Sequence, residues 1–264
     1  MFEELQKIGY KEYMYSQALP REIEGFNATQ IGNNTSNLDL IISNIDPNNN
    51  KPFAPELMDL IRLHYLCTSR KVVTILEFGC GYSTKIFDHA LASNKVKYED
   101  FVKSNLRKSA PFELHSVDNS KKWIRRTKSN FILNHTVFHF AKVRMTTFND
   151  RICTLYDQIP NISPDLIYLD GPSQFGVIGK VRGITTSKID RLPMAADILT
   201  LEHFLLPGCL IVIDGRTANS RFLKANLQRE WRYTYVEEYD QHFFELIEEP
   251  LGKLNAVQLS FSKV

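Results

Sequence analysis

The sequence lacks a long hydrophobic run: no stretch approaches the roughly 20 apolar residues that a membrane-spanning helix needs. Its first residues, MFEELQKIGYKEYMYSQ, include early acidic side chains where a secretory signal would carry an apolar segment. We therefore expect no membrane partner and no export, and the expected compartment is the cytoplasm.

Charge of one sign is not in excess either. The formal net charge is only +2 over 264 residues. A near-neutral total gives no reason to expect a polyanionic partner, so nucleic acid is disfavoured. Because 43% of the residues are hydrophobic, the chain is long enough to bury a sizeable core in one main domain.

Cysteine is scarce, and no two cysteines form a C-x-x-C pair. The four cysteines are Cys67, Cys80, Cys153 and Cys209. Three of them lie in or beside apolar runs, which is typical of buried free thiols in a reducing compartment. A cysteine-ligated zinc site is therefore disfavoured.

Short apolar runs alternate with helical patterns from Pro55 onward. We expect helices within 55–66, 83–92, 121–128, 194–205 and 220–231, and strands at 72–78, 112–117, 136–143, 165–170 and 209–214. Strands rich in Val, Ile and Leu that alternate with helices predict a parallel sheet buried on both faces. The expected fold class is α/β, with a Rossmann-like, doubly wound, mostly parallel sheet.

The tail breaks this alternation. Strand-like runs at 233–239, 243–247 and 256–261 have no helix-length gap between them, so we expect antiparallel C-terminal strands at one edge of the sheet. Residues 1–54 are rich in Asn and lack sustained periodicity, which predicts loops with short helical pieces. We expect this N-terminal extension to cap an acceptor pocket or mediate dimerisation, ahead of one domain over 55–264. The aromatic residues available for such contacts are Tyr10, Tyr13, Tyr15 and Phe26.

The most informative segment is ILEFGCGYST, residues 75–84, in which an apolar strand runs into two glycines and the start of a helix. Gly79 and Gly81 permit a tight turn and let a ligand approach the backbone. Ser83 or Thr84 can cap the helix, whose free N–H groups point towards the ligand. Alone, a G-x-G pair is as consistent with a simple tight turn as with a binding loop.

Two acidic residues strengthen the interpretation as a binding loop. Glu77 ends the strand before the glycines, and Asp118 ends the second strand in HSVD. A carboxylate after the second strand is placed to accept hydrogen bonds from both hydroxyls of a ribose. The third glycine of a dinucleotide-binding loop is absent because Thr84 stands there, which disfavours NAD.

Four segments together resemble the class I, S-adenosylmethionine-dependent methyltransferase superfamily. They are LEFGCGYST, HSVD, PDLIYLDGP and LLPGCLIVIDG, in that order along the chain. The resemblance covers about residues 57–262 and implies S-adenosylmethionine (SAM) as cofactor. It implies that Gly79, Cys80, Gly81, Ser83 and Thr84 hold the cofactor. It also places Glu77 near the amino group of the cofactor, Asp118 at its ribose, and Asp170 where cofactor and acceptor meet.

The sequence departs from the family pattern at two points. Asp118 follows Glu77 by far more than the roughly 20 positions of a compact unit, which predicts a polar surface insertion over 94–111. After the third strand, the run 141–148 offers no acidic residue for the adenine.

Asp170 and Asp214 end neighbouring strands at the edge where open α/β sheets bind ligands. Asp170 is the candidate catalytic residue, as a general base for an acceptor hydroxyl. The two carboxylates together are also a candidate Mg²⁺ site, because Mg²⁺ prefers oxygen ligands. The catechol-type methyltransferases, which this pair resembles, have Asp-Asn where this chain has Asp214-Gly215, so one expected ligand is missing.

The loop 171–193 is long and rich in Gly, Ser and Thr, and such loops at this edge often bind substrate. Its cations are Lys180, Arg182, Lys188 and Arg191. They are as consistent with an acidic or phosphate-bearing acceptor as with a solvated, mobile loop. His242 is the histidine best placed in sequence to reach the site; for all the histidines, packing or surface roles are expected first. Two further groups of basic residues lie within 121–128 and 216–232. They are Lys121, Lys122, Arg125, Arg126 and Lys128, and Arg216, Arg221, Lys224, Arg229 and Arg232.

The sequence therefore predicts a SAM-dependent methyltransferase that acts on a small-molecule or saccharide-like acceptor, by O-methylation. An RNA or DNA methyltransferase and a non-catalytic SAM-binding module are the alternatives. An NAD-type oxidoreductase is disfavoured, and aminopropyl transfer on the same fold stays open. A homo-oligomer also stays open.

Overall fold

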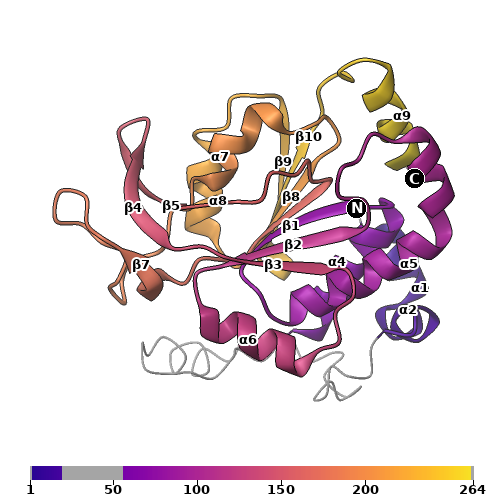
Figure 1. The fold of residues 1–264 in the computed structure, drawn as a ribbon, viewed down its shortest axis with the longest axis horizontal. Helices are drawn as coiled ribbons and strands as arrows, with labels where there is room; N and C mark the ends of the chain where they lie inside the picture. The colour runs from indigo at the N-terminus through magenta and orange to yellow at the C-terminus, as the bar shows by residue number, and fades with distance from the viewer. Residues whose placement is uncertain (1, 20–55, 263–264) are drawn as a thin grey trace.

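The computed structural model describes residues 2–19 and 56–262, and Figure 1 shows their arrangement around one central sheet. This sheet has seven strands in the order β3-β2-β1-β6-β8-β10-β9. The strands are β1 (Thr74–Phe78), β2 (Glu113–Asp118), β3 (Thr136–Phe140), β6 (Leu166–Leu169), β8 (Leu210–Asp214), β9 (Trp231–Val236) and β10 (Gln241–Leu246).

The first five strands of the order are parallel, and β10 runs antiparallel to both β8 and β9. Strand order reverses between β1 and β6, which marks the ligand-binding position in open α/β sheets. The expected Rossmann-like, doubly wound sheet with antiparallel C-terminal strands is thus confirmed.

Helices cover both faces of the sheet. One face packs against α4 (Leu57–Ser69) and α5 (Tyr82–Asn105), the other against α7 (Asp197–Leu201) and α8 (Thr217–Lys224). The central strands β1 and β6 are buried along their whole length, as their runs of apolar residues predict. On the first face, α1 (Glu3–Ile8) and α2 (Tyr10–Ser16) pack against α4.

Three differences from the sequence-based expectation concern the middle of the chain. The insertion expected over 94–111 is mostly helical, because α5 continues without a break to Asn105. The single strand expected at 136–143 is two strands, β3 and β4 (Val143–Phe148), and 151–156 forms a further strand, β5 (Arg151–Tyr156). The loop 171–193 contains a short 3-10 helix (Gln174–Gly176) and β7 (Val177–Ile178).

Strands β5, β4 and β7 form a second, smaller sheet that projects from one side of the molecule in Figure 1. The β4–β5 hairpin thus occupies the connection between β3 and β6, where a helix would complete the usual alternation. Its tight turn uses Asn149 and Asp150, both with positive φ, at which these residue types are tolerated. This hairpin matters for the site because β5 ends beside the strand-end loops of the main sheet.

The last strand-like run was wrongly assigned: residues 256–261 lie in the helix α9 (Lys253–Ser262). Leu254, Val257 and Phe261 are spaced as one face of a helix, and the ring of Phe261 stacks on Phe101 of α5 at 4.9 Å between centroids. The two helices predicted at 194–205 and 220–231 are also shorter than expected, ending as α-helices at Leu201 and Lys224.

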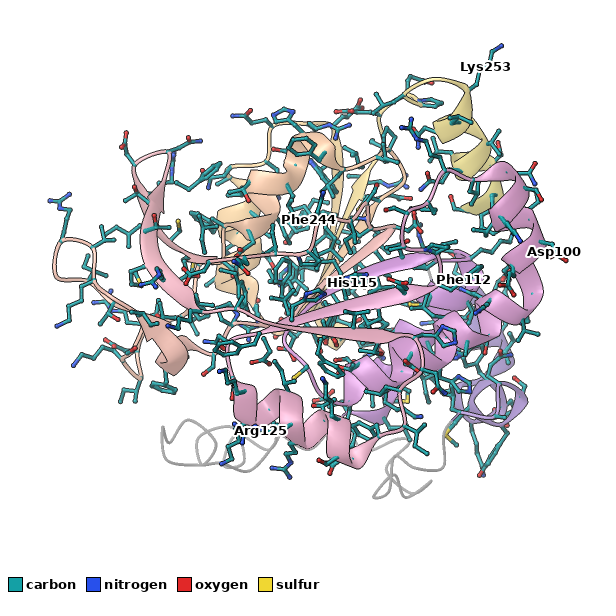
Figure 2. All side chains as sticks on the ribbon, in the orientation of Figure 1. Asp100, Phe112, His115, Arg125, Phe244 and Lys253 are labelled. Carbon is teal, nitrogen blue, oxygen red and sulfur yellow. The ribbon has the colours of Figure 1, made fainter. Side chains whose placement is uncertain are left out.

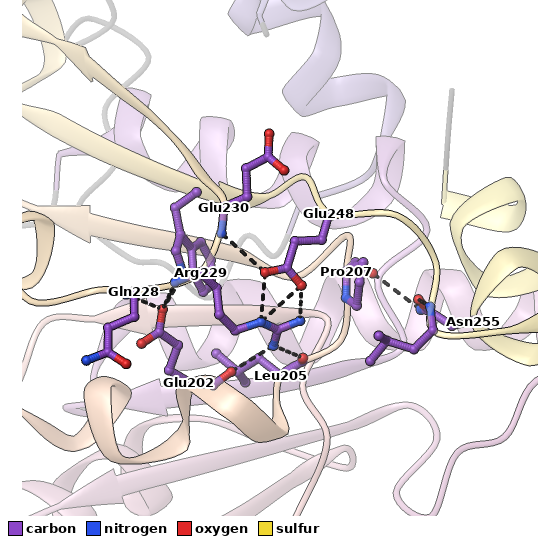
Figure 3. Close-up of polar contacts among 10 residues, drawn as sticks. Glu202, Leu205, Pro207, Gln228, Arg229, Glu230, Glu248 and Asn255 are labelled. Carbon is purple, nitrogen blue, oxygen red and sulfur yellow. Dashed lines mark hydrogen bonds and ion pairs between the residues drawn. The ribbon is translucent and has the colours of Figure 1, made fainter.

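A cluster of polar contacts around Glu202 and Arg229 follows the end of α8 at Lys224. Glu202 accepts hydrogen bonds from the backbone N–H groups of Gln228 and Arg229 and from Nε1 of Trp231 (Figure 3). Arg229 donates in turn to Glu248 and to two carbonyl oxygens (Figure 3). These contacts tie the start of β9 to the end of β10.

The described part of the N-terminal extension is helical, as expected, and it contributes to the core. Leu5 and Tyr13 are buried against α4, and the Tyr13 hydroxyl hydrogen-bonds His64 at 2.9 Å and Thr68 at 2.9 Å. Phe26 and the other residues between 20 and 55 lie outside the described residues. The boundary at residue 54, capping and dimerisation stay predictions.

Among the residues described, no helix is long and apolar enough to cross a membrane. All four cysteines are free; Cys67, Cys153 and Cys209 are buried, and Cys80 is partly exposed.

Candidate cofactor site and strand-end carboxylates

The glycine loop joins β1 to α5 at the carboxyl edge of the sheet. Gly79 has φ +98°, a conformation that favours glycine, and a Cβ there would lie 3.1 Å from the backbone of Asp170. The loops after β1 and β6 therefore touch through their backbones. Gly81 is different: a Cβ at this residue would meet no atom within 4 Å, so this residue borders open space.

Glu77, on β1, fixes this loop through hydrogen bonds. Its carboxylate accepts hydrogen bonds from Ser83 Oγ at 2.6 Å and Thr84 Oγ1 at 2.7 Å, and the Thr84 hydroxyl accepts from the Gly81 N–H at 2.9 Å. Burial raises the pKa of Glu77 to about 7, while the hydroxyl donors lower it. Glu77, Ser83 and Thr84 thus shape the loop through a buried network, and Thr84 fills the place of a third glycine.

Asp118 connects the end of β2 to the same loop. Its Oδ2 accepts from the backbone N–H of Cys80 at 3.2 Å and from Cys80 Sγ at 3.3 Å, and Oδ1 accepts from the Ser120 N–H at 2.6 Å. The side chain is almost fully buried, and this burial raises the pKa of Asp118. The structure therefore brings together the glycine loop and the acidic residue that the sequence assigned to one site.

Asp170 and Asp214 end neighbouring parallel strands, as expected, but their surroundings differ. The side chain of Asp170 is 56% exposed and forms an ion pair with Arg216 at 3.4 Å. Arg216 also donates to the carbonyl oxygens of Asp170 and Pro172 at 2.5 and 3.1 Å. Asp214 accepts from the Tyr168 hydroxyl at 3.2 Å, and burial together with the charge of Asp170 raises its pKa to about 7.

The contacts of Arg216 with the segment after β6 were not predicted from the sequence. The sequence analysis included Arg216 only as one cation in a basic run, although its position two residues after Asp214 places it at the strand end. The guanidinium holds the segment after β6 through three contacts.

The Mg²⁺ hypothesis gains no support from this arrangement. Within 2–19 and 56–262, no group of three or more His, Cys, Asp or Glu side chains is assembled as a metal site. Arg216 also places a positive charge against Asp170, which disfavours a divalent cation there.

The loop 171–193 reaches back across the edge to β2. Asn119, the residue after Asp118, donates through Nδ2 to the Gly176 carbonyl oxygen at 3.1 Å. Gln174 and Thr186 hydrogen-bond within the loop and fix its two arms together. The loop cations Lys180, Arg182, Lys188 and Arg191 are exposed.

Three of the histidines considered from the sequence, His242, His115 and His139, have side-chain partners of their own. His242 is buried on β10 between the hydroxyls of Thr217 and Tyr233, at 3.1 and 3.0 Å. His115 and His139 stack on each other across β2 and β3. None of the three forms a hydrogen bond with Asp170 or Asp214 in the part of the chain that the structure describes, and the suggestion that His242 reaches the site stays a prediction.

The first basic run forms a distinct surface on α6 (Lys121–Asn130). Its five cations, Lys121, Lys122, Arg125, Arg126 and Lys128, are all exposed, and the helix contains no acidic residue. Figure 2 shows Arg125 pointing away from the sheet.

No protein-family model matches the chain, and no curated protein matches it. Several solved structures are similar to it. One is an S-adenosylhomocysteine-bound methyltransferase, PaMTH1, of Podospora anserina: 12% identity, 80% of this chain and 88% of that chain covered, TM-score 0.42. Another is the O-methyltransferase TomG of Streptomyces achromogenes, in complex with SAM: 14% identity, coverages of 74% and 82%, TM-score 0.39.

A third is CalS11, a TDP-rhamnose 3'-O-methyltransferase of calicheamicin biosynthesis: 12% identity, coverages of 89% and 94%, TM-score 0.43. At these identities and TM-scores, the substrates of those proteins do not transfer to this chain.

Proposed function

We propose that the protein is a SAM-dependent methyltransferase that methylates an oxygen atom of a small-molecule or saccharide-like acceptor. One observation carries the proposal: Asp118 at the end of β2 hydrogen-bonds Cys80 within the glycine loop that follows β1. An adenosyl group needs a loop whose backbone it can approach closely. It also needs a neighbouring carboxylate that accepts hydrogen bonds from the ribose hydroxyls.

The residues at this edge fit such a cofactor. Gly81 borders open space, so its backbone is accessible to a ligand. A carboxylate has about four acceptor positions. Asp118 uses three of them, on Cys80 N–H, Cys80 Sγ and Ser120 N–H, which leaves capacity for a ribose hydroxyl.

Thr84 favours SAM over a dinucleotide as the ligand of the glycine loop. It is fully buried at the third-glycine position, where its hydroxyl is bound by the Glu77 carboxylate and the Gly81 N–H. In dinucleotide-binding loops a glycine at this position lets helix and strand approach closely. The antiparallel end of the sheet, β9 and β10, also differs from a continued parallel pattern.

In the proposed methyl transfer, the cofactor and the protein have different tasks. Bound SAM supplies an electrophilic methyl group, and the protein positions the acceptor and removes its proton. Asp170, exposed and held by Arg216, is the group that we place against the acceptor hydroxyl as general base. Burial and the charge of Asp170 raise the pKa of Asp214 to about 7, so this neighbouring carboxylate titrates near neutral pH.

Calorimetric titration of the purified protein with SAM and S-adenosylhomocysteine tests the proposal, with Asp118→Ala as the paired variant and NAD as the comparison ligand. We expect micromolar binding of both adenosyl ligands, loss of that binding in Asp118→Ala, and no binding of NAD. Folded wild-type protein that binds neither adenosyl ligand would refute the proposal.

Asp170→Asn separates catalysis from binding. The substitution keeps the size of the side chain but removes its basicity, so the SAM dissociation constant should be unchanged while methyl transfer to an acceptor found by screening is lost. Full retained activity would exclude Asp170 as the base. Mg²⁺ is not part of the proposal, and added EDTA should change neither quantity.

A second candidate, an RNA or DNA methyltransferase, is favoured by one observation: α6 exposes five cations and contains no acidic residue. Phosphate contacts release counterions, so polynucleotide binding would weaken steeply with salt. Filter binding at several salt concentrations, with Lys122→Glu and Arg125→Glu variants, distinguishes this candidate from a small-molecule enzyme.

A further inference from the structure

An exposed tyrosine ring lies at the carboxyl edge of the sheet, to one side of the strand-end carboxylates. Tyr235 is on the edge strand β9, one residue before that strand ends, and it is 42% exposed. One face of the ring stacks on the imidazole of His242, at 4.3 Å between centroids and 13° between planes. Among the described residues no second ring packs on Tyr235, so its opposite face is available to a ligand.

Asp240 lies beside this ring and has an unused acceptor oxygen. Its Oδ1 accepts hydrogen bonds from the Tyr235 hydroxyl at 3.2 Å and from Thr217 Oγ1 at 3.3 Å, whereas no donor of a described residue reaches Oδ2. The side chain is exposed, and its left-handed backbone conformation, with φ +48°, is one that aspartate tolerates. The ring and the carboxylate are therefore fixed against each other before any ligand binds.

Hydrogen bonds join this pair to the segment that follows β8. The Gly215 N–H donates to the Asp240 carbonyl oxygen at 3.0 Å, and Thr217 donates to the Asp240 side chain. Between Gly215 and Thr217 lies Arg216, which forms the ion pair with Asp170. The tyrosine and the proposed general base thus belong to one continuous edge of the molecule.

The strand register gives the separation between this pair and Asp170. Tyr235 pairs with His242 of β10, which pairs with Ile213 of β8. Ile213 pairs in turn with Leu169, the residue before Asp170 at the end of β6. Three strand spacings of about 4.8 Å each therefore put roughly 14 Å between the two ends of this row. One sugar ring is too short to contact both ends.

The chemistry of this surface fits an uncharged polyol. The face of a tyrosine ring is negative and attracts the polarised C–H groups on one side of a sugar ring. A carboxylate oxygen beside the ring accepts hydrogen bonds from the sugar hydroxyls. Glu237 and Glu238, both exposed, precede Asp240, so the local charge repels phosphate groups.

We propose that Tyr235 and Asp240 form a subsite for a second sugar ring of the acceptor, which is therefore a saccharide of at least two residues. The inference rests on the proposed function and specifies its acceptor. One ring of the saccharide presents its hydroxyl to Asp170, and another stacks on Tyr235 while a hydroxyl donates to Asp240.

Glycan binding by the protein tests this inference. An array of immobilised glycans of one to four sugar residues serves as the probe, and the protein is applied with S-adenosylhomocysteine present. We expect binding to glycans of two or more residues and much weaker binding to single residues. The dissociation constant of the glycan that binds best is then measured in solution by NMR titration.

Variants assign that binding to the proposed subsite. Tyr235→Ala and Asp240→Asn should each raise the dissociation constant about five- to ten-fold, whereas Tyr235→Phe keeps the ring and should retain most of the affinity. Tyr15→Ala is the matched control: Tyr15 is 62% exposed but lies on α2, so this change should leave glycan binding unaltered. All these variants should bind S-adenosylhomocysteine as the wild-type protein does, which shows that they are folded.

Three outcomes overturn the inference. Protein that binds S-adenosylhomocysteine but no glycan has no such subsite. Equal glycan affinity in Tyr235→Ala and the wild-type protein would place the saccharide elsewhere, and single residues that bind as tightly as longer glycans would contradict a second ring. Protein that binds neither SAM nor S-adenosylhomocysteine refutes the proposed function instead, and the acceptor role with it; this result is recognised before any glycan is tested.

Discussion

The Asp118 carboxylate accepts a hydrogen bond from the backbone N–H of Cys80 at 3.2 Å. Asp118 is the last residue of β2, and Cys80 lies in the loop that follows β1. Parallel pairing of β1 with β2 brings the two strand ends together, so a contact between distant sequence positions becomes the centre of the site. A change on either side of this contact should alter ligand binding.

The two glycines at this edge should respond differently to alanine. Gly81 has φ 173°, which any residue adopts, and a Cβ there meets nothing within 4 Å. Gly81→Ala should therefore leave the melting temperature unchanged but weaken SAM binding at least about ten-fold, because the added methyl group occupies ligand space. Equal affinity in calorimetry would show that the ligand does not pass Gly81.

Gly171→Ala is expected to damage the protein itself. Its Cβ would lie 2.7 Å from the Gly79 nitrogen and 2.9 Å from the Phe78 carbonyl carbon, both backbone atoms. The two strand-end loops would have to separate, so we expect a lower melting temperature as well as weaker SAM binding. A melting temperature equal to that of Gly81→Ala would contradict the close backbone approach.

The hydroxyl of Thr84 should matter more than its size. Thr84→Val keeps the shape but leaves the Glu77 carboxylate and the Gly81 N–H without this partner. We expect a loss of about 1–3 kcal/mol in the free energy of unfolding, measured by urea denaturation. Thr84→Ser, which keeps the hydroxyl, is the control and should retain most of that stability; equal losses in both variants would show that the methyl group is the important part.

The stability of the fold should fall as the pH rises through the weakly acidic range. Burial raises the pKa of Asp197 from 3.8 to about 7, so the folded state binds a proton more tightly than the unfolded chain does. Between those values the folded state holds more protons, and the free energy of unfolding decreases by roughly 1 kcal/mol per pH unit for this group. Above pH 7 the contribution no longer changes.

Asp197→Asn isolates that contribution. The amide keeps an oxygen acceptor for the Tyr156 N–H but does not titrate. Urea denaturation from pH 4.5 to pH 8 should give a flatter dependence for the variant than for the wild-type protein. Parallel curves would assign the pH dependence to other groups, of which Glu77 and Asp214 have pKa values raised to about 7 as well.

The ion pair in Figure 3 should stabilise the fold without affecting the ligand. Arg229 is largely buried and binds Glu248 and two carbonyl oxygens, all far along the chain from the glycine loop. Arg229→Ala should reduce the free energy of unfolding by about 3 kcal/mol, because it leaves a partly buried carboxylate unpaired. The exposed pair of Arg144 with Asp157 is the control, and Arg144→Ala should cost less than about 1 kcal/mol. Similar losses in the two variants would contradict this ranking.

Local patterns in the sequence were sufficient for the main sheet. Runs of Val, Ile and Leu predicted the central strands, since buried parallel strands require apolar residues on both faces. The glycines after β1 and the acid after β2 could be paired in advance, because the carboxyl ends of parallel strands meet at one edge. The antiparallel pair β9 and β10 followed from the absence of a helix between them.

Tertiary structure decided what local patterns could not. Residues 256–261 alternate enough to resemble a strand, yet packing of Phe261 on Phe101 favours a helix against α5. The role of Arg216 depends on the segment after β6 folding against it. The buried Tyr156 hydroxyl, which has no hydrogen-bond partner among the described residues, lies where it does because the hairpin docks beside Gly171. Periodicity records only which face of an element is apolar; whether a buried polar atom finds a partner depends on residues brought together from distant parts of the chain.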